Sequence, residues 1–514
     1  MLAWTIYISF LGALVLAFLP KTNARAARIT ALIAATAGLA VALAQFIRFH
    51  PGDILEVARV PWIPTLGIEY HLGADGISLT LVLLTGLASV AGILFSWNIE
   101  YRTKEFFACY LALIGGVYGV FLSFDLFLLF VFYEIAIIPK YFLIAIWGST
   151  RREYGAMKLA LYSFTGSAMV LAGLICAYVL AGANTFDLMA LSRHPFPPGF
   201  QMWAFPLVFL GFGILAGIWP LHTWAPTGHV AAPTAASMLL AGVVMKLGAY
   251  GCLRVAMTLF PQGLDAWSSP ILGFGSWRDV LAALAVIGII YGAMVALVQQ
   301  DFKFVIGYSS VSHMGFVLLG MMTLNQIGLS GSVLQMFSHG IIAGLLFAVV
   351  GRMVYDRAHT RDLGKLEKMG LHRVIPFAAV TFVIAGAASM GLPGFSGFVA
   401  ELQVLIGAWQ AFPTMAVLAG FGILVGVAYT WRAIQKAFFG DTNAAQPASA
   451  GADPAPLPRM DPISIPERLG AALLIGVSLL VGIYPHVLLR VIVPSFDSPL
   501  FARLFEWLRQ RGAQ

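Results

Sequence analysis

The sequence is short of charge. Lys, Arg, Asp and Glu together make up 10% of its 514 residues, whereas hydrophobic residues make up 60%. A soluble globular domain carries about 25% charged residues. The composition therefore excludes a soluble globular domain and predicts a multi-pass membrane protein. The net charge of +7 fits the loop bias of such a protein, and we expect no nucleic-acid partner.

The chain is also poor in cysteine. Cys109, Cys176 and Cys252 are scattered in apolar surroundings, without a CxxC pair or a Cys/His cluster. This pattern excludes a disulfide framework, a zinc site and an iron–sulfur centre, and buried free cysteines are expected. We therefore predict no metal and no cofactor in this chain. The first apolar run lacks a charged start and a cleavage site, so we interpret it as a retained helix.

Long apolar runs fill most of the chain. Because a crossing needs about 20 apolar residues, they predict an all-α membrane protein of about fourteen transmembrane helices. The expected spans are 3–20, 29–47, 75–98, 106–123, 125–147, 157–182, 203–224, 233–259, 280–299, 303–324, 327–354, 375–411, 414–439 and 467–493. The end, 495–514, is expected to form a short amphipathic helix that anchors at the membrane interface.

Two of the expected helices are interrupted. The twelfth is too long for one span and contains Gly391-Leu-Pro-Gly394, and the seventh ends at Trp219-Pro220. The interruptions lie five helices apart, which predicts two inverted five-helix repeats, helices 4–8 and 9–13, with broken helices seven and twelve. The expected parts are an N-terminal unit 1–105, repeats 106–260 and 280–440, a flexible cytoplasmic linker 441–466 rich in Pro, Ala and Ser, and a last helix with its tail, 467–514.

Loop charges predict the orientation. Most of the thirty lysines and arginines follow odd-numbered helices, whereas the loops after even-numbered helices hold few: Arg48, Arg59, Arg193, Arg254 and Arg278. By the positive-inside rule the first set of loops is cytoplasmic. We therefore expect a multi-pass protein of a bacterial inner membrane with both termini on the non-cytoplasmic side.

A few titratable residues lie inside the expected spans. They are Glu134 and Lys140 on helix five, Lys246 on helix eight, His313 on helix ten, His339 on helix eleven and Glu401 just after the break in helix twelve. A charge at membrane depth costs roughly 2.5–3.5 kcal/mol by insertion measurements. Burial disfavours the charged forms of Lys and Glu, and His titrates near neutral pH. Such a set is what a proton path through a membrane requires.

Each of these residues also has a structural interpretation. Glu134 with a buried lysine is compatible with an ion pair that only stabilises the fold. His313 and His339 are each compatible with a hydrogen-bonded core histidine, and Lys140 with a side chain that reaches the membrane interface. Asp301 and Lys303 are interpreted as a surface pair at a helix start. The proton-path hypothesis therefore depends on the set rather than on any one member.

Several motifs resemble the antiporter-like subunits of respiratory complex I. They are PLHTWAPTGHVAAPTAASMLLAGVVMKLGAYGCLR (220–254), QQDFKFVIGYSSVSHMGFVLLG (299–320), SHGIIAGLLFAVVG (338–351) and LPGFSGFVAELQVL (392–405). The resemblance covers roughly 2–490 and implies fourteen helices, inverted repeats and proton translocation driven by quinone reduction elsewhere in the complex. By motif it makes Glu134 the helix-five glutamate, Lys246 the helix-eight lysine, His313 and His339 the relay histidines, and Glu401 the terminal proton site.

Among the three types of this family, the chain is most similar to the M type. Glu401 stands where the L and N types and the Mrp antiporter subunits usually have lysine, and the long lateral helix of an L type is missing. The resemblance implies L- and N-type subunits and a peripheral redox arm as partners. NAD, FMN, iron–sulfur clusters and quinone are then expected in those partners. The alternatives are an Mrp-type Na⁺/H⁺ antiporter subunit, a subunit of an energy-converting hydrogenase or ferredoxin-driven complex, and a structural spacer without pumping.

One departure from the family concerns helix seven. The family usually has a lysine there that pairs with the helix-five glutamate, and this chain has Leu215 in that place. We expect Lys140 to replace the missing lysine. Six residues on an α-helix advance about 9 Å and turn by about 240°, so Lys140 and Glu134 do not share a face. A water-bridged link is therefore expected rather than a direct salt bridge.

Overall fold

The structure is a computed structural model that describes residues 1–271, 273–440 and 460–510. Within these residues, twelve helices are long and apolar enough to cross a membrane. They are α2 (Ala24–Arg48), α3 (Gly76–Phe95), α4 (Thr103–Leu122), α5 (Leu126–Trp147), α6 (Arg152–Ala181), α8 (Pro198–Ala216), the helix Thr234–Leu259 that contains α10, α11 and α12, α13 (Trp277–Val298), α14 (Phe302–Met322), the helix Gln326–Ala358 that begins with α15 (Gln326–Ala348) and ends with α16 (Asp356–Ala358), α21 (Pro413–Phe438) and α22 (Ile465–Ile483).

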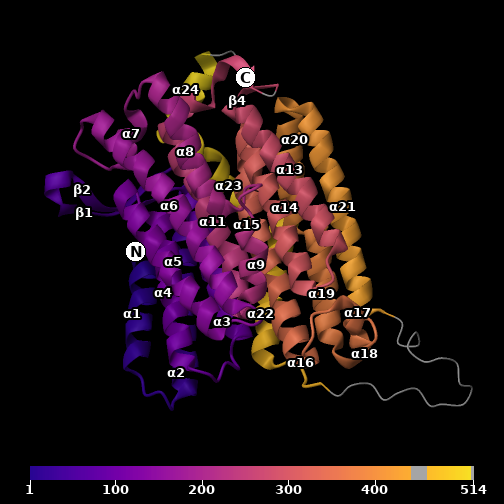
Figure 1. The fold of residues 1–514 in the computed structure, drawn as a ribbon. Coiled ribbons are helices and arrows are strands. Elements are labelled where there is room, and N and C mark those ends of the chain that lie inside the picture. Colours follow the sequence, from indigo (N-terminus) through magenta and orange to yellow (C-terminus); the bar gives the residue numbers. More distant parts are fainter. Residues whose placement is uncertain (272, 441–459, 511–514) are drawn as a thin grey trace, which may run out of the picture.

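Shorter apolar helices account for the remaining expected crossings. They are α1 (Ala3–Phe18) and the pair α19 (Pro376–Ser389) and α20 (Ser396–Ala411). The helices run side by side as one bundle (Figure 1). The helical fold is as predicted, and the repeat arrangement stays a prediction. Most of the expected linker, 441–459, lies outside the described residues.

Both expected helix breaks are present. The seventh expected helix is divided into α8 and the short α9 (Trp224–Ala231), and the twelfth into α19 and α20. Gly217, Gly391 and Gly394 take positive φ values of 84°, 71° and 99° at these breaks, a backbone region that glycine enters without steric cost. The breaks place irregular backbone in the middle of the bundle.

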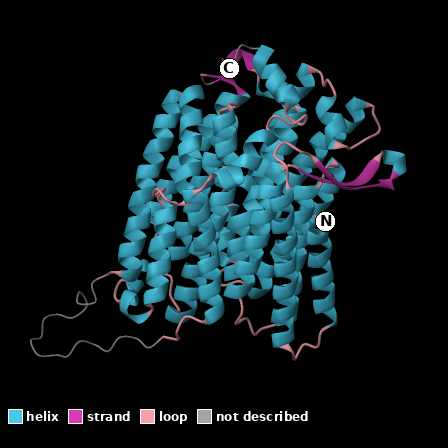
Figure 2. Cartoon of the chain, turned by 180° about the vertical axis from the view of Figure 1, so that it is seen from behind, coloured by secondary structure: helices cyan, strands magenta, loops and turns pink. Residues whose placement is uncertain are grey.

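Three features differ from the expected spans. The last helix is divided at Tyr484–Pro485 into α22 and α23 (His486–Ser495), because a proline supplies no backbone N–H to the helix. The segment expected to be loop between helices two and three contains the hairpin of β1 (Leu55–Ile63) and β2 (Ile68–Ala74), which projects from the bundle in Figure 2. A second hairpin pairs β3 (Ala266–Ile271) with β4 (Phe274–Ser276).

The C-terminal tail forms the expected amphipathic helix, α24 (Ala502–Gln510), but its apolar face is not free for a membrane. Leu504 and Leu508 are buried, and α24 packs against α12 (Met257–Leu259) and the turn Pro261–Leu264. The expectation of an interfacial anchor was wrong for this face, since the chain's own residues cover it.

One end of the bundle, the basic face, is formed by the loops 19–23, 96–102, 148–151 and 359–370. These loops are tied together: Lys104 donates to the carbonyl of Leu19, Trp147 to that of Tyr101, and Arg361 to that of Val230. In Figure 1 the basic face is at the bottom, and α24 lies at the opposite end, which we call the outer end. The bundle therefore has the charge asymmetry that the sequence predicts.

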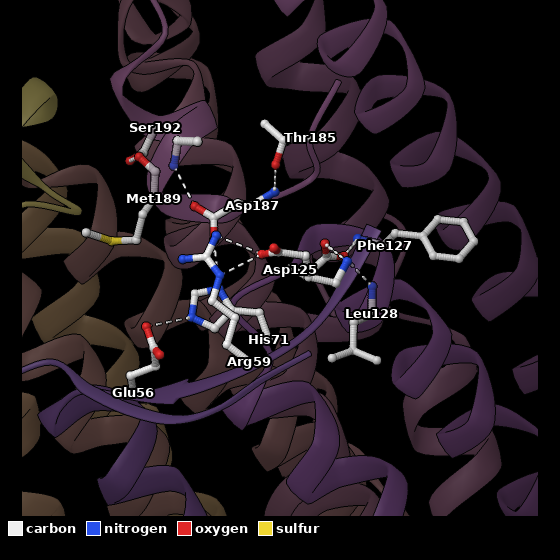
Figure 3. Close-up of polar contacts among 12 residues, drawn as sticks. Glu56, Arg59, His71, Asp125, Phe127, Leu128, Thr185, Asp187, Met189 and Ser192 are labelled. Carbon is white, nitrogen blue, oxygen red and sulfur yellow. Dashed lines mark hydrogen bonds and ion pairs between the residues drawn. The ribbon is translucent and has the colours of Figure 1, made fainter. Parts of the chain in front are cut away.

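A polar cluster at the outer end fixes the start of α5 (Figure 3). Asp125 caps that helix, accepting hydrogen bonds from the backbone N–H groups of Phe127 and Leu128, each at 2.9 Å. Beside it, the Nδ1 atom of His71 on β2 lies 2.7 Å from Oδ2 of Asp187. Burial alone raises the pKa of Asp187, but hydrogen bonds from His71 and from a backbone N–H, with the charges of His71 and Arg59, bring its pKa below the ordinary value. The cluster ties the β1–β2 hairpin to the helix that carries Glu134.

Candidate functional site

Lys246 lies at the centre of the bundle, on α11 (Met245–Gly251). Its helix is completely buried, and α11 stands between two wider π-helical segments, Leu240–Val244 and Cys252–Ala256. Nζ of Lys246 donates to the backbone carbonyl of Ala241 and lies 2.8 Å from Nδ1 of His339 on α15. Interruptions of this π type in helices are frequent at functional sites.

The line of titratable groups continues from His339. Its ring stacks on the ring of His313 with centroids 5.3 Å apart. Nδ1 of His313 lies 3.0 Å from Oε1 of Glu401 on α20, and its Nε2 lies 3.2 Å from the Ser389 hydroxyl at the end of α19. The structure thus brings together a central row that we define as Lys246, His339, His313 and Glu401.

The break in the twelfth expected helix positions the end of this row. A Cβ atom on Gly391 would stand only 2.9 Å from Oε2 of Glu401, so the glycine leaves room for the carboxylate beside the broken backbone. Nε2 of Gln335 lies 3.5 Å from Oε1 of Glu401 and 3.4 Å from Nδ1 of His313. The carboxylate is therefore held between α15, α14 and the break, where it can exchange a proton with His313.

The two titratable residues of α5 lie near a neighbouring helix, α6. Nζ of Lys140 lies 3.3 Å from the hydroxyl of Ser163 on α6, and the carboxylate of Glu134 is within electrostatic range of Lys140. Lys140 is only 1% exposed, so the interpretation that it reaches the membrane interface was wrong. Glu134 and Lys140 form no direct salt bridge, as the helix geometry predicted, and the water-bridged link between them stays a prediction.

Leu215 is buried near the end of α8, where its backbone lies against Gly248, two residues after Lys246. Tyr133 of α5 contacts Phe212 of α8, with ring centroids 5.6 Å apart. The end of α8 therefore contacts both α5 and the helix that carries Lys246.

Sequence reasoning missed a buried ion pair. Arg254 was counted among the loop residues, yet it and Asp75 are both buried, and their side-chain atoms Nη2 and Oδ1 lie 2.5 Å apart. Arg254 also donates to the hydroxyls of Tyr250 and Ser78. The partners are distant in the sequence, so no local pattern indicated the pair.

The interpretation of Asp301 and Lys303 as a surface pair was also wrong. Asp301 does not hold the ammonium of Lys303: the carboxylate of Asp301 caps α14, accepting from the backbone N–H of Lys303, and pairs with Arg361 at 3.3 Å. Lys303 itself is 3% exposed and points into the bundle. His229, on α9, was passed over too, although it is fully buried and its two ring nitrogens have no hydrogen-bond partner among the described residues.

The fold and the central row define a class: a helical membrane protein with interrupted helices and a buried line of titratable groups. Residues 123–426 match the family described as NADH:quinone oxidoreductase/Mrp antiporter, transmembrane. The chain belongs to this family.

Its relatives and structural neighbours agree. The chain is 36% identical to NADH-quinone oxidoreductase subunit M of Pseudomonas aeruginosa, covering 97% of each chain, and 35% identical to subunit M of Rhodobacter capsulatus, covering 92% of this chain and 90% of the relative. A chain of respiratory complex I from Thermus thermophilus superposes with a TM-score of 0.85 at 28% identity, over 98% of this chain and 99% of that chain. A chain of the Mrp complex from Dietzia sp. shares the fold, with a TM-score of 0.81 at 22% identity over 100% of this chain and 98% of that chain.

Proposed function

We propose that this chain is the M-type proton-translocating subunit in the membrane arm of a bacterial NADH:quinone oxidoreductase. The observation that carries the proposal is the central row, in which successive titratable groups lie within hydrogen-bonding or ring-stacking distance. In this function Lys246 receives a proton, His339 and His313 relay it, and Glu401 holds it before release. Glu134 and Lys140 act as a charge pair that biases Lys246.

The proposal includes an orientation and a set of partners. The basic face is cytoplasmic, by the positive-inside rule, and both termini lie on the other side of the inner membrane. NAD, FMN, iron–sulfur clusters and quinone are held by the peripheral arm and its neighbours, and the chain packs against L- and N-type subunits. On α5, Ile138 and Phe142 are 54% and 42% exposed, one turn apart and beside Glu134, which makes this helix a candidate contact for such a partner.

The test uses Lys246→Met in inside-out membrane vesicles that contain the whole complex. We expect NADH oxidation with lost proton pumping, measured by quenching of a pH-sensitive dye, and a complex of unchanged subunit composition. Lys246→Arg is the matched variant that keeps the positive charge. Full pumping by Lys246→Met in an assembled complex would overturn the function proposed for the row.

The Mrp-type alternative predicts a different dependence. A Na⁺/H⁺ antiporter subunit would make ion movement depend on Na⁺ and not on an electron donor. Glu401 in place of the lysine usual in that group favours the complex I function, and replacing Na⁺ by K⁺ in the same vesicles separates the two. A structural spacer is disfavoured by the central row itself, since a spacer gains nothing from buried titratable groups that are costly to insert.

A further inference from the structure

Lys303 is a buried lysine that the central row leaves unused. It lies in the first turn of α14, at the basic face, and its Nζ donates to the carbonyl of Ala232 at 2.9 Å and lies 3.5 Å from the Ser237 hydroxyl. The nearest acidic side chain in the sequence, Asp301, is paired with Arg361 instead. The ammonium of Lys303 is therefore held by neutral oxygens at the break between α9 and α10 (Thr234–Leu239).

A cavity of about 230 Å³ connects Lys303 with the basic face. Its lining runs from the exposed Asn98 and Asp356 to the buried Ala232 and Lys303. Water occupies about 30 Å³ per molecule in the liquid, so the cavity has room for several molecules. Solvent at the basic face can thus reach the amine.

His229 lies on the other side of Lys303. The Ser237 hydroxyl, which Lys303 approaches, donates to the backbone carbonyl of His229 at 2.7 Å. The ring of His229 is within electrostatic range of both Lys303 and Lys246, and His339 is within range of His229. The imidazole of His229, both of whose nitrogens are unpaired among the described residues, is therefore near both Lys303 and the start of the central row.

We propose that Lys303 is the proton-uptake group of this chain and that His229 passes the proton from it to Lys246. Solvent in the cavity gives a proton to the neutral amine of Lys303, which becomes an ammonium. The ammonium gives a proton to one nitrogen of His229 and returns to the amine, and the imidazolium gives a proton from its other nitrogen to Lys246. The proposal deepens the proposed function and rests on it.

A purely structural role makes a different prediction. A lysine at the C-terminal end of a helix stabilises the last carbonyls through its charge and hydrogen bonds, and Lys303 contacts the end of α9 in this way. Arg361 already donates to Val230 at the same end, at 3.0 Å. A structural role needs only a fixed positive charge at Lys303, whereas a proton-uptake role needs an amine that can lose its proton.

The experiment separates these roles by chemical replacement of the amine. Lys303→Cys is made in the full complex, in a chain whose three native cysteines are replaced by serine, and studied in vesicles of both orientations. Aminoethyl methanethiosulfonate adds a titratable amine to the new thiol, and its trimethylammonium analogue adds a charge without a transferable proton. Asn98→Cys, at the cavity mouth, is the accessible control, and Val311→Cys, buried on the same helix, is the inaccessible one.

We expect the cysteine of Lys303→Cys to react from the basic face only. Unmodified, the variant is expected to lose pumping by about tenfold or more, since a positioned proton-transfer group contributes about 10²–10⁴-fold. The aminoethyl reagent restores pumping and the trimethylammonium reagent does not. Lys303→Arg, which keeps the charge, is expected to pump as poorly as the unmodified cysteine variant.

Three outcomes would overturn the proposal: restoration by both reagents, wild-type pumping by unmodified Lys303→Cys, or labelling only from the outer end. Each leaves the proposed function intact if Lys246→Met still abolishes pumping. Full pumping by Lys246→Met would instead remove the proposed function, whatever the labelling of Lys303→Cys.

Discussion

Lys140 and Ser163 meet inside the bundle, with Nζ of the lysine 3.3 Å from the serine hydroxyl. The contact joins α5 to α6. The position of the Lys140 side chain on α5 therefore depends on the Ser163 hydroxyl of α6.

Replacing Ser163 by alanine removes the hydroxyl that Lys140 contacts, which should weaken the interaction between Lys140 and Glu134. A hydrogen bond to a charged group is worth about 1.5–3 kcal/mol, so Ser163→Ala is expected to lower the number of protons pumped per NADH while leaving NADH oxidation largely intact. The ratio of dye quenching to NADH oxidation measures the effect. Thr165→Ala, which changes an exposed hydroxyl on the same helix, is the control. An equal effect of both variants would mean that Ser163 only supports α6.

The replacement of the helix-seven lysine by Lys140 can be reversed. Lys140→Leu is expected to reduce pumping by about a hundredfold or more, the scale of a lost proton-transfer group, and adding Leu215→Lys is expected to recover part of it. The double variant puts the lysine back where the family usually has it. Proton pumping in vesicles with matched amounts of assembled complex is the measurement. Wild-type pumping by Lys140→Leu alone would mean that the lysine is dispensable.

The buried pair of Arg254 and Asp75 is expected to support stability. Removing one partner of a buried ion pair costs about 3–5 kcal/mol, because the other charge is left unpaired, whereas apolar replacement of both partners is often neutral. Asp75→Asn should therefore lower the thermal midpoint of the complex strongly, and Asp75→Leu with Arg254→Met should lower it less. Thermal unfolding of the purified complex provides the comparison. A double variant that is less stable than Asp75→Asn would contradict this account.

The outer polar cluster should respond to acid. The pKa of Asp187 is below its ordinary value in the folded protein, so its stabilisation is complete above the unfolded value of about 3.9 and is lost as pH falls through the native value. The difference in thermal midpoint between wild type and Asp187→Asn should be present at about pH 4 and shrink below that. Asp53→Asn, at an exposed carboxylate, is the control. A difference that persists at the lowest pH would argue against the depressed pKa.

Residues that interrupt an apolar pattern could be predicted well. Lys246, His313, His339 and Glu401 were visible because each is polar within a long hydrophobic run, and both helix breaks were visible from glycine and proline. The structure places these four residues in one row, and their role in proton transfer stays a prediction. The divided last helix shows the limit of this prediction, because the expected span 467–493 continued past the single proline at Pro485, where the structure divides the helix.

Side-chain direction and distant pairing could not be predicted. Lys303 follows an aspartate at a helix start, a pattern typical of an exposed cap, and only the packing of α14 against α9 turns its ammonium inward. Arg254 finds Asp75 across 179 residues of sequence. The β1–β2 hairpin had a local signal, the alternation around Leu55–Ile63, which the search for long apolar runs does not detect.

The π-helical segment before Lys246 ties the lysine to the winding of its own helix. The N–H of Met245 donates a hydrogen bond to the carbonyl of Leu240. Nζ of Lys246 donates to the carbonyl of Ala241, which in an ordinary α-helical turn would accept from the N–H of Met245. Tightening this turn would return that carbonyl to the backbone and free the amine. The proton affinity of Lys246 and the winding of its helix are then thermodynamically linked, so a change in the protonation of this amine would change the stability of the π-helical turn.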